Sequence, residues 1–386
     1  MSVGALVPGL LLLGVPGVAH AGTFVVDDDM ACPGAQVPTI QQAANAALPG
    51  DTIKVCAGTY LETVTVNKTL IFKGAKAGIA TATRTGAGES TVKGAGGVSD
   101  IAFDVQANNV VIDGFTVKDA DPGIFLHNNR TGAQLRYNIV KQNVFGVYLN
   151  SGGTPRTVIE NNLFSDNNKP GAAAGNGIYS DQGLNAATIK LNEFRNNQNA
   201  GILLAQSAPI NDVNIKSNKS FDNSSFVAAF SGAAITVTLN TTNDTIPADN
   251  GFQGSAVFIG GNTSSASVTS NTIKNSPFNG IAIRAQSNNV VVQANTVKLS
   301  SNDGISVSSS TPGGVSVLSN IVEFSQFDGI SLTDTTLGDT VSGNTSTNNA
   351  AVDCRDSTVG NVTFGTANTW ASNTGNTASP PGICVP

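Results

Sequence analysis

The chain has 386 residues, of which 42 are glycine and only 12% are charged. Its 20 Lys and Arg residues against 26 Asp and Glu give a net charge of −6, and no basic run occurs, which argues against a nucleic acid or an anionic membrane as partner. Few charges combined with many hydroxyl and amide side chains are typical of extracellular β-rich proteins.

The first 21 residues have the pattern of a secretory signal peptide. An apolar core at Leu10–Leu13 is followed by Ala19-His20-Ala21, whose small residues suit cleavage before Gly22. A membrane anchor is the alternative, but the apolar run is short and is interrupted by Pro8 and Pro16. We therefore expect a secreted protein, extracellular or periplasmic, with no membrane span in the mature chain.

Residues 22–75 are predicted to form an N-terminal cap and the first coil. Thr39–Ala47 is the best helix candidate in the chain, because it is followed by the helix-ending pair Pro49-Gly50. Earlier in this segment, Asp27-Asp28-Asp29 could bind calcium, although a carboxylate run near a new N-terminus is more often a solvated turn. No other cofactor or metal site is indicated.

The body of the chain, residues 76–345, contains a repeat. An Asn stands at the start of a short apolar strand at Asn138, Asn162, Asn192, Asn218, Asn271, Asn295, Asn320 and Asn344. The successive gaps are 24, 30, 26, 53, 24, 25 and 24, and the gap of 53 predicts one hidden rung. A second series, of glycines, opens another strand at Gly123, Gly146, Gly177, Gly201, Gly280, Gly304 and Gly329. The longest Asn-to-Gly gap contains an insertion at 166–176.

Three short strands per repeat of about 24 residues, without helices, predict an all-β, single-stranded, right-handed parallel β-helix of about ten coils. We expect the Asn to occupy a tight turn, where it tolerates a left-handed backbone and bonds along the stack. A solenoid of this kind needs covered ends. The helix covers one end, and residues 346–386 are predicted to be an irregular C-terminal cap around Trp370.

The four cysteines lie in two pairs near the ends of the chain. Of the three connectivities that four cysteines allow, Cys32–Cys56 with Cys354–Cys384 is the simplest, since each bridge closes a modest loop. An exported protein favours such disulfides. A metal site is disfavoured, because no cysteine lies within four residues of another and histidine is nearly absent.

The segment PTIQQAANAALPGDTIKVCAGTYLETVTVNKTLIFKGA (38–75), followed by the repeats, resembles the pectin-lyase-like superfamily of right-handed parallel β-helix proteins. That superfamily includes lyases, hydrolases, esterases, epimerases, adhesins and non-catalytic proteins. Gly58-Thr59-Tyr60-Leu61-Glu62 is similar to a Gly-x-Tyr-x-Glu segment of pectin methylesterases, but the later catalytic segments of those enzymes do not follow. The catalytic elements of polygalacturonases and of the best-known pectate lyases are also missing.

The resemblance implies that a ligand groove runs along the first parallel sheet, whose strands the glycines open. Alternation then decides which residues point outward. One outward column contains Phe125, Tyr148 and Tyr179, after Ala102, and the neighbouring column contains Asp104, His127, Asn150 and Asp181. Aromatic faces beside amides and carboxylates suit sugar rings. We therefore predict substrate binding by Phe125, Tyr148, Asn150, Tyr179 and Asp181.

His127 is the only histidine left after cleavage of the leader, and Asp104 is expected to lie one coil away. His127 could act as general base or acid, oriented by Asp104, with Tyr148 as proton donor and Arg130 as charge stabiliser. Asp104 and Asp181 should be about 14 Å apart, too far for the carboxylate pair of a glycosidase. The sequence therefore favours a polysaccharide lyase or uronate epimerase over a hydrolase.

The resulting prediction is a monomeric, secreted β-helix protein whose partner is an extracellular polysaccharide, which it binds and could cleave or epimerise. The alternative is a non-catalytic surface or envelope protein in which the β-helix is a rigid spacer or adhesin. An enzyme should place the aromatics, His127 and Asp181 around an open groove, whereas a spacer should cover or scatter them.

Overall fold

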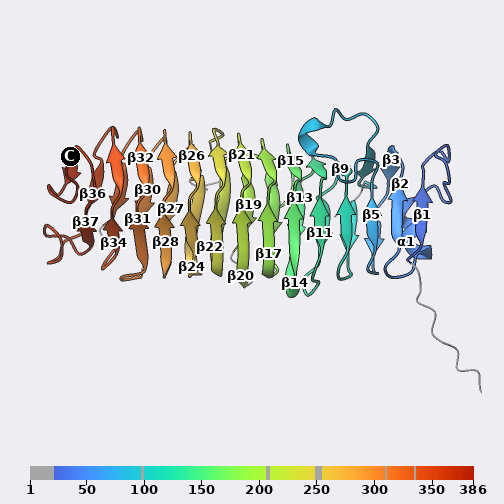
Figure 1. Cartoon of the computed structure of the whole chain (residues 1–386), viewed down its shortest axis with the longest axis horizontal. Helices are drawn as coiled ribbons and strands as arrows, with labels where there is room; N and C mark the ends of the chain where they lie inside the picture. The colour runs from blue at the N-terminus through green and yellow to red at the C-terminus, as the bar shows by residue number, and fades with distance from the viewer. Residues whose placement is uncertain (1–20, 97–99, 206–208, 248–253, 309–310, 334–335) are drawn as a thin grey trace, which may run out of the picture.

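The chain forms one elongated stack of β-strand turns (Figure 1). The computed structural model describes residues 21–96, 100–205, 209–247, 254–308, 311–333 and 336–386. These residues form a parallel β-solenoid of about 14 turns that is 3% helical, so the predicted fold class is confirmed, although ten coils is an underestimate. The additional turns lie near the two ends, where the Asn and Gly pattern is weak. The predicted signal peptide falls outside the described residues except for Ala21.

Each turn contributes strands to three faces, all paired in parallel. The first face contains β4 (Val64–Val66), β7 (Phe103–Val105), β10 (Pro122–Leu126), β13 (Phe145–Leu149), β16 (Asn176–Ser180), β19 (Ala200–Leu204), the first parts of β22 (Ser225–Thr238) and β24 (Val257–Ser264), β27 (Ile281–Ile283), β30 (Ile305–Val307), β33 (Ile330–Leu332), β36 (Cys354–Asp356) and β38 (Ala378–Ser379). 

The second face contains β1 (Thr23–Val26), β2 (Thr52–Val55), β5 (Ile71–Lys73), β8 (Val111–Asp113), β11 (Gln134–Arg136), β14 (Ser151–Glu160), β17 (Leu184–Lys190), β20 (Ile210–Lys216), the second part of β22, β25 (Ser267–Thr269), β28 (Val290–Gln293), β31 (Val315–Leu318), β34 (Thr340–Ser342) and β37 (Thr369–Ala371). Because β22 runs through the corner between them, the first and second faces form one hydrogen-bonded sheet of 26 strands.

The third face is a separate sheet of 12 strands. It contains β3 (Gly58–Leu61), β6 (Ser90–Lys93), β9 (Phe115–Lys118), β12 (Ile139–Lys141), β15 (Leu163–Ser165), β18 (Glu193–Arg195), β21 (Lys219–Phe221), β23 (Thr241–Asn243), β26 (Thr272–Lys274), β29 (Thr296–Lys298), β32 (Ile321–Glu323) and β35 (Thr345–Thr347). 

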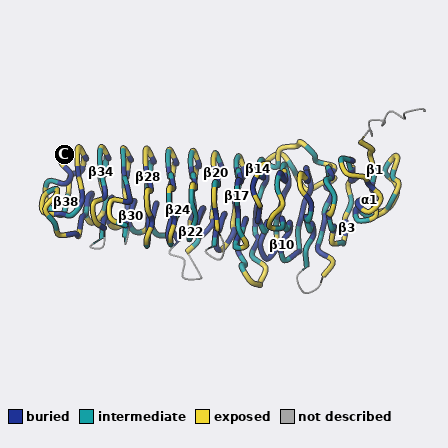
Figure 2. The backbone as a smooth tube through the Cα atoms, turned by 90° about the horizontal axis from the view of Figure 1, so that it is seen from below, coloured by how far each residue is buried: buried dark blue, intermediate teal, exposed yellow. Residues whose placement is uncertain are grey.

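The core is a set of apolar columns that run the length of the stack. On the first face, Ile124, Val147, Ile178 and Ile202 are aligned on consecutive turns and are fully buried. Parallel rungs lie about 4.8 Å apart, so each side chain packs directly on the next. Figure 2 shows these buried segments alternating with exposed corners and loops along the whole tube. Burial of one side of every strand therefore supplies the main stabilisation.

The predicted Asn ladder is present and is longer than expected. Each side-chain oxygen accepts hydrogen bonds from the backbone and amide nitrogen of the preceding ladder residue, at 2.8–3.1 Å. The hidden rung of the sequence pattern is Asn240, and Asn373 extends the ladder beyond Asn344. The left-handed residue, however, is the one before each Asn, such as Leu191 with φ 56° and Leu239 with φ 56°. The role of the Asn itself is hydrogen bonding.

A second ladder stacks Asn143, Asn167, Asn197 and Asn223 and ends at a carboxylate, Asp244. Asp244 is completely buried and accepts hydrogen bonds from Ser220 Oγ at 2.8 Å and from the backbone of Asn223 at 3.0 Å. Burial is the main cause that raises the pKa of Asp244 from 3.8 to about 6, and these hydrogen bonds oppose it.

We predict that Asp244→Asn stabilises the protein above pH 6. The native carboxyl keeps its proton up to about pH 6, whereas the unfolded one loses it near 3.8, so wild-type stability falls as pH rises through this window. The amide does not titrate, and the gain at pH 8 should be about 3 kcal/mol in the free energy of unfolding by urea. The gain should vanish near pH 4. A gain that does not change with pH, or that Asp222→Asn reproduces, would contradict this account.

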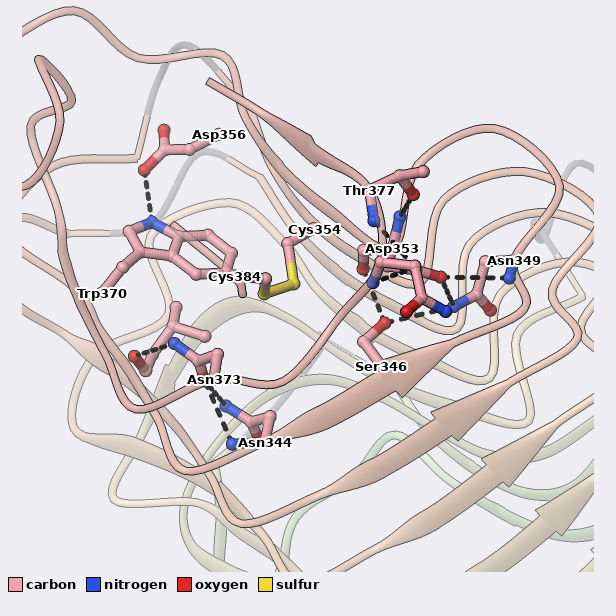
Figure 3. The surroundings of a disulfide bond; sticks show 12 residues. Asn344, Ser346, Asn349, Asp353, Cys354, Asp356, Trp370, Asn373, Thr377 and Cys384 are labelled. Atoms are coloured by element: carbon pink, nitrogen blue, oxygen red, sulfur yellow. Dashed lines mark hydrogen bonds between the residues drawn. A yellow bond between two sulfur atoms is a disulfide. The ribbon is translucent and has the colours of Figure 1, made fainter. Parts of the chain in front are cut away.

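The ends of the solenoid are covered as the sequence suggests. α1 (Ile40–Ala46) begins after Thr39, whose Oγ1 accepts a hydrogen bond from the Gln42 backbone, and it covers the N-terminal end. Both predicted disulfides, Cys32–Cys56 and Cys354–Cys384, are present. The C-terminal segment is more regular than predicted, because β36, β37 and β38 pair onto the stack. Figure 3 shows Trp370 beside the second disulfide, with its indole nitrogen donating to Asp356 at 2.7 Å.

Candidate carbohydrate-binding face

Three aromatic side chains stack on the outer side of the first face. Phe125 on β10, Tyr148 on β13 and Tyr179 on β16 are aligned in the parallel register. The ring centroids of Phe125 and Tyr148 are 4.7 Å apart with an interplanar angle of 17°, and those of Tyr148 and Tyr179 are 5.6 Å apart at 26°. All three are only partly buried. We call Phe125, Tyr148 and Tyr179 the aromatic platform.

An apolar pocket of about 350 Å³ opens beside the aromatic platform. Its floor and sides include Phe125, Phe145 and Tyr148, and its far wall is formed by Pro170 and its neighbours in the 166–176 insertion. Phe145 packs edge-on against Tyr148 and Tyr179, with centroids 5.5 and 5.6 Å away, and thereby fixes the orientation of both rings. The insertion thus forms one wall of the pocket beside the platform.

Asp181 lies at the edge of the platform and accepts hydrogen bonds from two phenols. Tyr179 Oη donates to it at 3.0 Å, and Tyr148 Oη donates to its other oxygen. Burial is the first cause that raises the pKa of Tyr179 to about 12, and hydrogen bonding to Asp181 adds to it. The same two causes raise the pKa of Tyr148 well above its usual value. Both tyrosines are therefore neutral phenols held in fixed rotamers.

His127 and Asp104 form a hydrogen-bonded pair next to Phe125. The distance from His127 Nε2 to Asp104 Oδ1 is 2.6 Å, and the imidazole stacks on Phe125 with centroids 3.9 Å apart. The other carboxylate oxygen of Asp104 accepts from Gln106 Nε2 at 2.6 Å. The His127 side chain is 33% exposed and that of Asp104 is 14% exposed. The structure thus brings the predicted acid–base pair together, with the imidazole more accessible than the carboxylate.

The predicted register of the first of these strands is wrong by two residues. Asp104 aligns with Phe125, in the column of the aromatic platform, and not with His127. Ala102, which the sequence placed in that column, is completely buried. The reason is that this strand has no opening glycine to mark its start. The His127–Asp104 contact is therefore a diagonal one between neighbouring rungs.

Two other predicted site residues lie in the turns that follow β10 and β13. Asn150 is completely buried at the corner after β13, where its Oδ1 accepts from the Gln182 backbone at 3.0 Å. It supports the turn and cannot contact a ligand on the platform. Arg130 is exposed in the turn after β10, and its guanidinium makes no hydrogen bond or ion pair to any residue that the structure describes. Its backbone nitrogen donates to the His127 carbonyl at 3.3 Å, and its role as charge stabiliser stays a prediction.

The apolar surface extends further along the first face than the sequence indicates. Leu203 and Ala228 follow Tyr179 in the same register, and Phe258 follows them. Phe230 and Phe258 pack together with centroids 5.0 Å apart, and with Tyr179 they cover Leu203 and Ala228. The sequence reasoning missed both phenylalanines because their strands lack an opening glycine. Their only sequence signal is the apolar alternation of 225–238 and 257–260.

The Asp27-Asp28-Asp29 group lies far from the platform, in the N-terminal cap. One carboxylate oxygen from each of the three lies within 4.8 Å of the others. Each already accepts a backbone hydrogen bond, from Cys32, Thr59 and Ala31 respectively. These bonds explain the group as a set of turn-stabilising contacts, and calcium binding stays a prediction.

The Gly-x-Tyr-x-Glu segment also has a structural explanation. The two carboxylate oxygens of Glu62 accept hydrogen bonds from the backbone nitrogens of Ile40 and Gln41, at 2.8 and 2.9 Å, at the start of α1. Tyr60 Oη donates to the carbonyl of Cys56 at 3.0 Å. Both side chains fasten the N-terminal cap to the first coils. The similarity to the esterase segment therefore reflects the fold of this end.

A family model described as "Right handed beta helix region" matches residues 56–183 and 153–243. Together with the parallel solenoid and the Asn ladder, this match decides the classification. The fold is that of a right-handed parallel β-helix, as the resemblance of the sequence implied. No curated protein matches this β-helix protein significantly in sequence.

Solved structures show the same fold in proteins of different functions. The catalytic unit of a GH87 α-1,3-glucanase from Streptomyces thermodiastaticus is 17% identical, with a TM-score of 0.64 over 93% of this chain and 70% of the glucanase chain. PfbA, a surface adhesin of Streptococcus pneumoniae, is 18% identical, with a TM-score of 0.56 over 82% of this chain and 92% of the adhesin. At these identities the similarity of the β-helix protein to both shows the fold alone.

Among the described residues of the β-helix protein, no helix has the length and apolarity to cross a membrane.

Proposed function

We propose that this β-helix protein binds an extracellular polysaccharide along its first face. The observation that carries the proposal is the aromatic platform beside the apolar pocket of about 350 Å³. The rings stack on one another and on His127, so they present their edges to solvent, and a sugar ring would lay its apolar C–H groups across these edges while its hydroxyls bond adjacent polar groups such as Asp181 and His127. Because the platform places one ring on each of three consecutive rungs, about 4.8 Å apart, it fits a polymer better than a single sugar.

Two observations support an extracellular setting. The protein has two disulfides among its described residues, and disulfides persist in oxidising compartments. The structural neighbours are an α-1,3-glucanase and a surface adhesin, so both a carbohydrate-active and an adhesin-like role suit the fold.

A second candidate function is catalysis by the His127–Asp104 pair, as a polysaccharide lyase or uronate epimerase. The specific observation in its favour is the 2.6 Å contact, which orients a partly exposed imidazole beside the platform. Tyr148 is a weak proton donor for such a reaction, because its raised pKa opposes proton release and its hydroxyl already bonds Asp181. Catalysis would therefore depend on His127 as base. The arrangement supports binding more directly than turnover.

A polysaccharide screen separates binding, catalysis and a spacer role. We expect the wild-type protein to be retarded in native gels that contain a polysaccharide it recognises, from a panel of pectate, alginate, glycosaminoglycans and α-glucans. Unsaturated or epimerised uronate products, followed by ultraviolet absorbance and NMR, would demonstrate the catalytic version. His127→Gln should then reduce product formation by about 100-fold while retardation persists. Absence of retardation in every gel would contradict the binding proposal.

A further inference from the structure

Three lysines occupy one register position on consecutive turns of the third face. Lys93 on β6, Lys118 on β9 and Lys141 on β12 are aligned in the parallel register. Rungs lie about 4.8 Å apart, and like charges directly opposite each other destabilise a sheet. Asp119 is within 3.1 Å of the first ammonium and 3.4 Å of the second. The Lys141 ammonium makes no hydrogen bond or ion pair with any described residue.

A long loop crosses over this lysine column. Residues 74–89, which contain the short helix η1 (Thr81–Thr83), form the arch at the top of Figure 1. Arg84 fixes the arch to the third face: its guanidinium is buried, is paired with Glu89, and donates to the Phe115 carbonyl at 3.2 Å and to Thr116 Oγ1 at 3.3 Å. The arch is thus a preformed wall rather than a loose loop.

A pocket and an adjoining shallow depression lie along the lysine column. The first, of about 450 Å³, lies beneath the arch and is lined by Lys118, Lys141 and several hydroxyl side chains, including Thr91 and Ser165. The second, of about 700 Å³, shares Lys118 and Asp166 with the first and adds Lys169, Gln142 and Asn168. Together they form a groove, which we call the lysine groove, with ammonium groups spaced along hydroxyls and amides. 

The charges of the lysine groove fit an anionic chain with separated charges. Of its acidic residues, Asp119 is shared by two lysines, Glu89 is paired with Arg84, and Asp166 accepts a hydrogen bond from Asn196. Lys141 and Lys169 have no ion pair among the described residues, and Lys118 shares its one carboxylate partner with Lys93, so all three keep positive charge for a ligand. A densely phosphorylated polymer is disfavoured by these carboxylates and by the net charge of −6. Carboxylated sugars supply single negative charges at rung-like spacing together with hydroxyls.

We propose that the lysine groove is a second binding site, specific for an acidic polysaccharide and separate from the aromatic platform. Lys118 and Lys141 bind carboxylates on successive sugars, while the hydroxyl and amide side chains bond the ring hydroxyls. The ligand also relieves the repulsion within the lysine column. This inference does not depend on ligand binding by the first face.

Affinity electrophoresis of the full chain in polygalacturonate gels tests this site. We expect Lys118→Gln/Lys141→Gln to weaken retardation by at least about tenfold, and high salt to weaken that of the wild type, because the contacts are ionic. Lys274→Gln/Lys298→Gln is the matched control, because these two lysines occupy the same register position of the third face on β26 and β29, outside the arch. The control substitutions remove the same net charge as the groove substitutions. The control should bind like the wild type.

Equal retardation of both double variants would overturn the proposal, as would equally strong wild-type binding to duplex DNA or to phosphatidylglycerol vesicles. Thermal unfolding checks that the groove variant is folded, and its midpoint should not fall, because the substitutions remove repulsion. Phe125→Ala/Tyr148→Ala should keep the lysine-dependent retardation. This result distinguishes failure of the lysine groove from failure of the aromatic platform.

Discussion

Replacing Asn192 by Ala should lower the free energy of unfolding by about 3–5 kcal/mol. Its Oδ1 accepts from the backbone nitrogen and from Nδ2 of Asn162, both at 3.0 Å, and its Nδ2 donates to the Ile159 carbonyl at 2.9 Å and to Asn218 Oδ1 at 3.1 Å. All of these groups are buried, so water cannot replace the lost partner without opening the corner. Each polar group left buried without a partner costs about 1–3 kcal/mol.

Urea unfolding followed by circular dichroism measures this loss. Asn211→Ala is the matched control on the same turn, because Asn211 is exposed and its side chain makes one bond, to Asn185 at 3.2 Å. The control should change the unfolding free energy by less than about 0.5 kcal/mol. If Asn192→Ala were as stable as the control, the ladder would be a consequence of the fold and not a source of its stability.

The ladder illustrates how much of the fold can be predicted from the sequence. A side chain that must recur at every turn leaves a period, and the interval of 53 residues predicts one hidden rung, which the structure identifies as Asn240. The left-handed positions could not be predicted this way. They fall on residues as different as Tyr137, Leu191 and Ser217, because the ladder hydrogen bonds impose the turn on whichever residue precedes the Asn.

The candidate site was predictable in part, for a related reason. Alternation from an opening glycine placed Phe125, Tyr148 and Tyr179 in one outward column, and the structure aligns them there, since their strands begin in the same way. The same alternation placed Asp104 two residues out of register, opposite His127 instead of Phe125. It also could not show that Asn150 turns inward at a corner. The register of strands without an opening glycine, and the conformation of the corners, are set by packing against neighbouring turns. A local sequence pattern carries no information about that packing. The lysine column escaped notice because it becomes a column only after the third face is aligned.

Removing two rings of the aromatic platform should weaken polysaccharide binding strongly. Phe125 and Tyr148 are stacked 4.7 Å apart and both line the apolar pocket, so Phe125→Ala/Tyr148→Ala removes the surface on which two consecutive sugars would lie. Each aromatic contact contributes about 1 kcal/mol or more, so the dissociation constant should rise by at least about thirtyfold. The fold should persist, because both side chains point outward and Tyr179 still bonds Asp181 at 3.0 Å.

The most direct test is isothermal titration calorimetry with an oligosaccharide of the polymer that retards the wild type. Ser306→Ala/Ser331→Ala is the matched control, because these serines occupy the same outward column on β30 and β33, away from the platform. The account predicts a dissociation constant at least about thirtyfold higher for the aromatic double variant and an unchanged one for the serine double variant. Equal affinity of the aromatic double variant and the wild type would contradict the claim that the first face binds the polysaccharide.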